Sequence, residues 1–214
     1  MDVRVELEQA SRSMQFALSD AKLIRLVQYL ALFQKWNAAY NLSALKSQQD
    51  ILIKHLFDCL AIVSSIEAEI NSRPALPKTI LDIGTGAGLP GLILAICLPN
   101  VQVTMLDAIH KKITFVQHVI GQLKLENATA HAIRIQDWKD AHTVITARAW
   151  TALADIPRLS AHTVALGGCI AAMKGPRLAT EAEALPNDWQ ITNVIPIAVP
   201  QLLEERSLAI LQRV

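Results

Sequence analysis

The sequence predicts an α/β protein with a mostly parallel, doubly wound sheet, an antiparallel hairpin at its C-terminal edge and a helical cap at the N-terminus. From residue 79 onwards, short apolar runs alternate with segments of helical period, which is typical of βαβ units. The first apolar run, residues 79–83, is followed by glycines at alternate positions. The last two runs have no helix-length segment between them, which favours an antiparallel hairpin.

Composition indicates a compact protein that stays in the cytoplasm. The chain has 214 residues, 52% of them hydrophobic, which is enough for a substantial core. Its formal net charge is +1, so a nucleic acid would have to be bound by a local basic patch. The 3 cysteines are widely spaced, which argues against a disulfide framework and a zinc site. The N-terminus lacks the apolar segment of a secretion signal.

The first 70 residues are predicted to form the helical cap. Ser19 can begin a long amphipathic helix, because its hydroxyl can accept a hydrogen bond from the first turn. Ser47 followed by Asp50 forms a similar start for a later helix. Residues 71–78 contain two prolines and are interpreted as a linker to the core, residues 79–214, with which the cap is expected to form one unit. The expected helices span about residues 2–17, 19–41 and 50–66.

The core is predicted to alternate strands with helices. Helical spacing predicts a helix from Pro90 to about residue 98, another opened by Lys111 and Lys112, and a third over residues 151–164. The uncharged stretch at 83–106 contains glycines and prolines, so it is interpreted as loop, helix and buried strand, and no membrane span is expected. The expected strands span residues 79–83, 101–106, 128–133, 143–147, 169–173, 189–195 and 207–212.

The turn after the first strand is the main candidate site. Gly84, Gly86 and Gly88 permit a tight turn in which the backbone lies close to a ligand. A dinucleotide fingerprint would need glycine where the chain has Leu89. The G-x-G-x-G spacing after an acidic residue instead resembles motif I of the class I S-adenosylmethionine-dependent methyltransferases, with a purely structural turn as the alternative. Asp82 is expected either to meet the cationic amino group of the cofactor or to cap the turn.

Two other strand ends are expected beside this turn, because such sheets bind ligands outside the carboxyl ends of their strands. Asp107 ends the second strand, where an acid can accept hydrogen bonds from both ribose hydroxyls of an adenosine. Arg148 ends the fourth strand in the segment T-A-R-A-W, which carries neither the Asn/Asp-Pro-Pro of amino-methylating enzymes nor a cysteine for covalent catalysis. An arginine there suits a nucleophile with a free lone pair, such as guanine N7, while a surface arginine or an ion-paired arginine is the alternative.

A series of separated segments carries a wider resemblance. The segments are K-W-N-x-x-Y-N-L at 35–42, K-H-L-F-D at 54–58, D-I-G-T-G-A-G-L-P-G at 82–91, L-D-x-x-x-K-K at 106–112, L-x-L-E-N at 123–127, T-A-R-A at 146–149, M-K-G at 173–175 and E-R-x-L at 205–208. In this order they resemble the bacterial small-subunit rRNA guanine-N7 methyltransferase family (RsmG, also called GidB). The resemblance implies a Rossmann-like class I core that transfers a methyl group from S-adenosylmethionine to N7 of a guanine in 16S rRNA, free or in an assembling small ribosomal subunit. A guanine inside a helix is hard to approach, so an unstacked target is expected.

The resemblance also implies roles for single residues. Those expected to contact the cofactor are Gly84, Leu89, Asp107, Ile135, Gln136 and Arg148. Gln136 departs from the family pattern, which usually has an acid there; an amide can still hydrogen-bond but carries no charge. Those expected on the RNA side are Asn41, His55, Asp58, Lys111, Lys112, Lys174 and Arg206. The basic residues among them, with Arg177, are candidate phosphate contacts, and a solvated surface charge is the alternative for each.

Other functions stay open at this level. A class I methyltransferase acting on a small molecule or on another RNA position would share the glycine turn. An NAD-dependent oxidoreductase would need glycine at position 89, and a non-catalytic nucleotide-binding module would bind cofactor and transfer nothing. For methyl transfer to a nitrogen lone pair we expect neither a metal ion nor a general base, and we expect a monomer.

Overall fold

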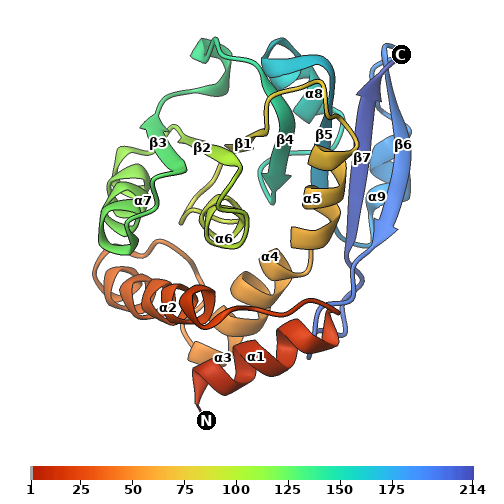
Figure 1. The fold of residues 1–214 in the computed structure, drawn as a ribbon. Coiled ribbons are helices and arrows are strands. Elements are labelled where there is room, and N and C mark those ends of the chain that lie inside the picture. Colours follow the sequence, from red (N-terminus) through yellow and green to blue (C-terminus); the bar gives the residue numbers. More distant parts are fainter. Residues whose placement is uncertain (1) are drawn as a thin grey trace.

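The centre of the molecule is a seven-stranded sheet, and the computed structural model describes residues 2–214. The strands are β1 (Thr79–Ile83), β2 (Gln102–Asp107), β3 (Ala128–Ala132), β4 (His142–Arg148), β5 (Val164–Lys174), β6 (Trp189–Pro196) and β7 (Ser207–Arg213). Their order is β3-β2-β1-β4-β5-β7-β6, parallel from β3 to β5, with β7 antiparallel to both of its neighbours. Figure 1 shows the β6–β7 hairpin at one edge of the molecule. The predicted fold class is confirmed.

Helices precede the sheet and connect its strands. The N-terminal helices are α1 (Val3–Ser13), α2 (Asp20–Tyr40), α3 (Gln48–Ile51), α4 (Asp58–Leu60) and α5 (Val63–Asn71), with a π-helix, η1 (Leu52–Phe57), between α3 and α4. The connecting helices are α6 (Gly91–Cys97), α7 (His110–Leu123), α8 (Asp155–Ser160) and α9 (Leu178–Ala182), with 3-10 turns at η2 (Ile135–Asp137) and η3 (Ala161–Thr163). Ser19 and Ser47 cap α2 and α3 as predicted. No helix within residues 2–214 is long and apolar enough to cross a membrane.

The segment predicted as one helix over residues 50–66 is divided in the structure. The π-helix η1 interrupts it, and a turn at Ala61 and Ile62 separates α4 from α5. A π-helix replaces the i→i+4 hydrogen bonds by i→i+5 bonds, and such turns are frequent at functional sites. Residues 54–57 lie on η1, so the irregular part of this helix carries four of the five residues of the K-H-L-F-D segment.

The helix predicted over residues 151–164 is shorter, and the strand after it is longer. α8 starts at Asp155, two residues before Pro157, because proline is tolerated in the first turn of a helix and not in its interior. β5 begins at Val164 instead of residue 169, and a register shift between His142 and Val144 accommodates the additional residues. The short helix α9 was not predicted, and none of its residues is buried.

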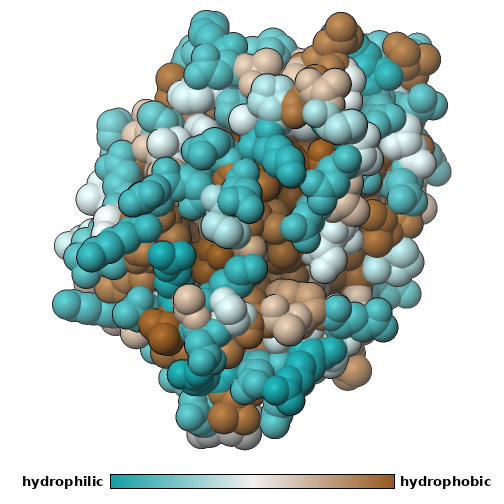
Figure 2. Space-filling view, viewed as in Figure 1, coloured by the Kyte–Doolittle hydropathy of each residue, from teal (hydrophilic) through white to brown (hydrophobic). Residues whose placement is uncertain are grey.

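Side chains alternate between the two faces of the sheet, and each face has its own buried cluster. Ile80 and Val144 belong to the larger cluster, which includes residues of α2 and of α4 to α7. Leu81 and Ile145 belong to the smaller one, which Ile156 of α8 completes. Figure 1 shows α5, α6 and α7 side by side along the sheet, and Figure 2 shows hydrophilic side chains over most of the visible face. Because both faces are covered, a ligand can reach the sheet only at the strand ends.

The N-terminal helices pack directly on the core. Phe33 of α2 is fully buried in the larger cluster, and its ring centroid lies 6.1 Å from those of Tyr29 and of Phe115 in α7. The buried Tyr29 hydroxyl donates a hydrogen bond of 3.1 Å to the carbonyl oxygen of Ala87, in the glycine turn. Helix α2 therefore supports the glycine turn, and Figure 1 shows α1, α2 and α3 as a layer below the sheet in this view.

Candidate cofactor and substrate site

The glycine turn after β1 requires glycine at its first position. Gly84 has φ +65°, a backbone conformation that residues other than glycine rarely adopt. A Cβ atom on Gly84 would also lie 2.2 Å from Cδ1 of Trp150, on the loop after β4. The indole of Trp150 therefore rests directly on the turn. Gly86 and Gly88 also have positive φ values, +59° and +82°.

Asp82 holds the turn and the start of α6 together. Its side chain is fully buried, and one carboxylate oxygen accepts hydrogen bonds from the Thr85 hydroxyl and, at 2.9 Å, from the backbone N–H of Gly91. The other oxygen accepts a hydrogen bond of 3.1 Å from the hydroxyl of Thr146 in β4. Burial raises the pKa of Asp82 to about 6, although the hydrogen bonds oppose this. These contacts match the turn-capping alternative.

Asp107 is fixed by backbone groups at the end of β2. One carboxylate oxygen accepts a hydrogen bond of 3.0 Å from the N–H of Gly86, and the other one of 2.9 Å from the N–H of Ile109. The ammonium group of Lys112 lies 3.4 Å from the first oxygen. Asp107 retains 8% exposure, so a nearly buried acid is held at the edge of an open cavity.

That cavity has a volume of about 420 Å³, within the range of small-molecule sites. Five of the predicted site residues line it, namely Gly84, Asp107, Lys112, Ile135 and Gln136. Gly86, Gly88 and Leu89 do not line it; they shape the turn beneath it. The lining residues that sequence reasoning missed are Leu106, Ala108, Ile109, Ile133, Arg134, Ala149 and Trp150. The apolar residues at 109, 133 and 135 line the cavity because of how the loops fold, which the sequence does not show. Trp150, an aromatic residue just after the end of β4, could have been identified in the sequence as a candidate site residue.

Arg148 points to the helical cap, where it joins an ionic cluster. Its Nη1 lies 3.1 Å from the carbonyl oxygen of Lys54 and 3.3 Å from a carboxylate oxygen of Asp58, and its Nη2 lies 3.4 Å from Nδ1 of His55. The second oxygen of Asp58 is 3.5 Å from Nε of Arg206. Burial raises the pKa of Asp58, and the two arginines oppose this rise. The cluster thus contains a buried ion pair, which agrees with the alternative interpretation of Arg148. It also contains polar atoms that have no hydrogen-bond partner among the described residues.

Arg148 also lines a second cavity. The Nε of Arg148 is buried without a hydrogen-bond partner among the residues described. The cavity beside it has a volume of about 300 Å³ and is lined by Lys54, Asp58, Arg148, Ala149, Thr151, Met173, Lys174, Gly175, Arg177, Glu181 and Arg206. Ala149 lines both cavities. The first cavity is lined at the ends of β1 and β2, and the second at the ends of β4 and β5. Because β1 pairs with β4, the two cavities follow one another along the strand ends.

Three predicted substrate residues line neither cavity. His55 accepts or donates a hydrogen bond of 3.0 Å with the Ser43 hydroxyl, and burial, followed by the Arg148 charge, lowers its pKa to about 4. Asn41 ends α2 in a left-handed conformation and accepts a hydrogen bond of 2.9 Å from Lys46. Lys111 is exposed and donates a hydrogen bond of 3.2 Å to the carbonyl oxygen of Tyr40. Asn41 and Lys111 therefore mark a surface next to the first cavity, and His55 supports Arg148.

The fold is the Rossmann-like fold of the class I methyltransferases. The magnesium protoporphyrin IX methyltransferase ChlM of Synechocystis PCC 6803, solved with bound S-adenosylmethionine, has the same fold, with a TM-score of 0.59, 14% identity, and coverage of 92% of this chain and 98% of that one. TrmN of Thermus thermophilus gives a TM-score of 0.56 at 18% identity, covering 71% of this chain and 49% of TrmN.

Sequence comparison narrows the class to a family. The family model for rRNA small subunit methyltransferase G matches residues 22–209. The ribosomal RNA small subunit methyltransferase G of Ralstonia nicotianae is 40% identical over 98% of this chain and 95% of its own length. The protein of the same name from Herminiimonas arsenicoxydans is 38% identical over 97% of this chain and 94% of its own length. The chain belongs to the rRNA small subunit methyltransferase G (GidB) family, as its motifs predicted.

Proposed function

We propose that the protein transfers a methyl group from S-adenosylmethionine to N7 of a guanine in 16S rRNA, either free or within an assembling small subunit. One observation carries the proposal. The cavity formed by the glycine turn and Asp107 is followed along the strand ends by a basic cavity that contains Arg148. A methyl donor and an anionic substrate would thus be bound next to each other.

The residues of the first cavity fit S-adenosylmethionine. The Asp107 carboxylate is held by backbone N–H groups and can still accept hydrogen bonds from ribose hydroxyls at its remaining lone pairs. Ile109 and Ile135 offer apolar walls for an adenine, and the amide of Gln136 can hydrogen-bond its edge. The bound cofactor supplies an electrophilic methyl group, and the chain's task is to hold it and the acceptor atom in line.

The second cavity fits an RNA segment. Its lining contains the basic side chains of Lys54, Lys174, Arg177 and Arg206 in addition to Arg148, against two acidic ones. Lys174 is held by Glu181 at 2.7 Å and donates a hydrogen bond of 2.9 Å to the carbonyl of Thr151. This local excess of positive charge suits phosphate oxygens and the guanine edge, even though the whole chain has a net charge of only +1.

The groups around Arg148 favour an acceptor that needs no deprotonation. His55 has a pKa of about 4 because burial and Arg148 disfavour its charged form, and its Nδ1 is close to Arg148. Both carboxylate oxygens of Asp58 lie beside arginine guanidinium groups, so the carboxylate is occupied by ion pairs, although burial raises its pKa. The buried Cys59 has a raised pKa, so it is a poor nucleophile. Guanine N7 has a free lone pair and requires orientation only.

The first test is methyl transfer itself. Wild-type protein is incubated with labelled S-adenosylmethionine and with small-subunit rRNA that lacks the modification, both free and in assembling particles, and the labelled base is mapped. Label at N7 of one guanine is the expected result. Label on a different rRNA atom or on no RNA would contradict the proposal and favour another class I substrate.

Arg148 provides the second test. We expect Arg148→Ala to slow single-turnover transfer by about 5- to 150-fold, the equivalent of a bidentate contact of roughly 1–3 kcal/mol, and to change cofactor affinity far less. Arg148→Lys should restore little, because lysine keeps the charge without the planar fork. Arg158→Ala, an exposed arginine paired with Asp155, is the matched control. Transfer at the wild-type rate in Arg148→Ala would leave the ion pair as its only role.

A further inference from the structure

Trp150 lies where the two halves of the site meet. Its indole rests on Gly84 in the cofactor turn, with Cδ1, Cγ and Nε1 within 3.0 Å of where a Cβ atom on Gly84 would be. Trp150 lines the first cavity and also a third one, shared with Ala149, Thr151, Arg177 and Glu181. These last four residues also line the basic cavity. Trp150 therefore lies between the cofactor cavity and a third cavity that shares four lining residues with the basic one.

The backbone after β4 separates Trp150 from Arg148. Ala149 has φ +49°, a left-handed conformation that is uncommon for residues other than glycine. Arg148 points to Lys54, His55 and Asp58, while Trp150 lies on Gly84 of the glycine turn. A partly exposed indole, packed against the smaller buried cluster, is thus held at the boundary between cofactor and substrate space.

An aromatic surface suits the chemistry at this boundary. N7 of a guanine can approach the methyl group only after the base has left its stack in the RNA. An aromatic side chain can replace that stacking, and every base has a π face to offer. Among the described residues that line the three cavities, Trp150 is the only aromatic one.

We propose that Trp150 stacks on the target base and positions it against the methyl group of the cofactor. This inference rests on the proposed function and adds a base-positioning residue to it. According to this inference, the rate of methyl transfer depends on the aromatic ring of Trp150 and not only on the volume of its side chain. A tryptophan that merely closes the wall of the cofactor cavity would affect cofactor binding and transfer alike.

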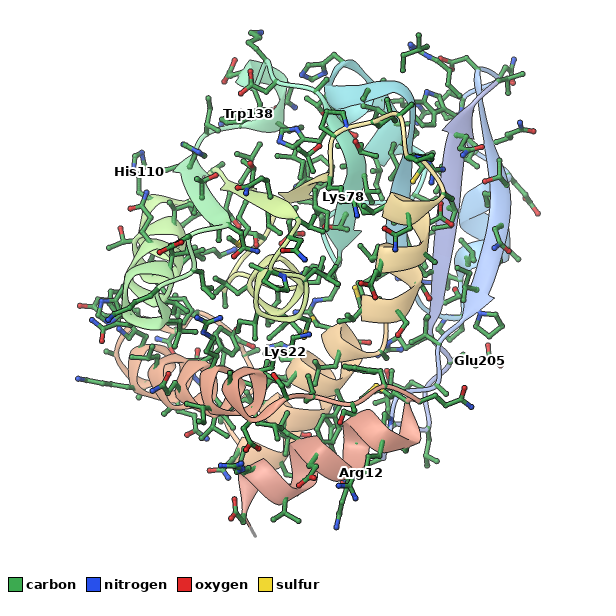
Figure 3. The ribbon with its side chains drawn as sticks, viewed as in Figure 1. Arg12, Lys22, Lys78, His110, Trp138 and Glu205 are labelled. Carbon is green, nitrogen blue, oxygen red and sulfur yellow. The ribbon has the colours of Figure 1, made fainter. Side chains whose placement is uncertain are left out.

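The test compares Trp150→Phe with Trp150→Leu in full-length protein. We expect Trp150→Leu to slow single-turnover methylation of rRNA about 5- to 150-fold, as the stacking free energy of roughly 1–3 kcal/mol per base implies. Trp150→Phe should stay within about threefold of wild type, because the ring is retained. Affinity for S-adenosylmethionine should change by less than about threefold in both. Trp138→Leu, at the partly buried tryptophan labelled in Figure 3 that lines none of these cavities, is the matched control and should transfer at the wild-type rate.

A second measurement isolates the base. Wild-type protein should bind a short target RNA more tightly than the same RNA with an abasic target position, and Trp150→Leu should reduce this preference while Trp150→Phe keeps it. If Trp150→Leu does not fold, Trp150→Met serves, since methionine adapts to irregular spaces. Equal rates in wild type and the non-aromatic variants, or a parallel loss of cofactor affinity, would overturn the inference while leaving the proposed function intact. Absence of rRNA methylation by the wild type would overturn both.

Discussion

At the scale of single residues, the carboxylate of Asp107 is oriented before any ligand arrives. Two backbone N–H groups, from Gly86 and Ile109, hold its two oxygens. A carboxylate that accepts such bonds loses less conformational freedom when it binds a sugar hydroxyl, so more of each new hydrogen bond contributes to affinity. The same contacts tie the glycine turn to the end of β2.

We expect Asp107→Ala to weaken S-adenosylmethionine binding by about 1.5–3 kcal/mol, the range for hydrogen bonds to a charged group. Asp107→Asn, which keeps an acceptor oxygen, should lose less. Isothermal calorimetry measures both, with Asp188→Ala as the control, since Asp188 lies near Arg213 at the other end of the molecule. Unaltered affinity in Asp107→Ala, or tight NAD binding by wild type, would contradict the assignment.

His55 gives the protein a predictable dependence on pH. Its pKa in the folded state is about 4, whereas an unfolded chain has a histidine pKa of about 6.5. Between these values the unfolded state binds more protons, so stability decreases as pH falls from about 6.5 to 4. Wild type should lose roughly 2 kcal/mol more than His55→Gln between pH 7.5 and pH 5. Urea unfolding at the two pH values measures this difference, and equal losses would show that His55 is not buried in its neutral form.

At the scale of elements, side chains at the ends of helices and strands fix how those elements meet. Asn127, just before β3, donates through Nδ2 to the carbonyl oxygens of Ala95, Leu98 and Val101, at 3.1, 3.2 and 3.0 Å. The backbone carbonyl oxygen of Asn127 accepts a hydrogen bond of 2.8 Å from the backbone N–H of Val103. One buried amide thus connects the end of α6 with β2 and β3, which explains the asparagine of the L-x-L-E-N segment in physical terms.

Asn127→Ala should destabilise the protein by about 1–3 kcal/mol, because it leaves buried carbonyl groups at the end of α6 without a donor. Chemical denaturation measures the loss. Asn187→Ala removes the same amide from an exposed loop position and should stay within about 0.5 kcal/mol of wild type. A similar small effect for Asn127→Ala would mean that water replaces the lost amide.

At the scale of the whole molecule, the basic side chains are concentrated in particular places, so RNA is expected to bind there and not over the whole surface. The chain is nearly neutral, at +1, yet its basic side chains gather at the second cavity and at the start of α7. We also propose that the helical cap (residues 1–70), the linker (71–78) and the core act as one unit, since residues of cap and core share one buried cluster. The Arg148 cluster supports this proposal, because β4 supplies one partner and the cap supplies the others.

RNA affinity should fall as salt rises, with a modest slope. Each phosphate contact to single-stranded RNA contributes a slope of about −0.7 in log K against log salt. Replacing Lys111 and Lys112 by Gln should flatten the slope by about 1 to 1.5. The control replaces Lys22 and Lys78 by Gln, which changes the net charge equally. These two lysines, labelled in Figure 3, line none of the described site cavities, so their replacement should leave the slope unchanged. RNA binding that is independent of salt, or equal effects of the two double substitutions, would contradict a basic RNA-binding surface confined to the site.

The sequence by itself determined the features that depend on neighbours along the chain. Ser19 and Ser47 begin helices because a hydroxyl at the N-cap pairs with the first turn. The apolar runs fixed the strands, and their spacing fixed a mostly parallel sheet with a final hairpin. The glycines and Asp107 indicated where a nucleoside would bind, because backbone conformation at a turn is a local property.

Only the tertiary structure decided which distant side chains meet. Arg148 contacts Asp58, 90 positions away, and this contact requires the cap to pack against the carboxyl end of β4. Trp150 rests on Gly84 only because β4 pairs with β1, so the T-A-R-A-W segment showed an aromatic near the β4 end but not its contact with the glycine turn. The π-helix at 52–57 likewise follows from packing, since no local pattern distinguishes it from an ordinary helix. Local preferences fix the elements, whereas buried contacts between elements far apart in the chain fix the site.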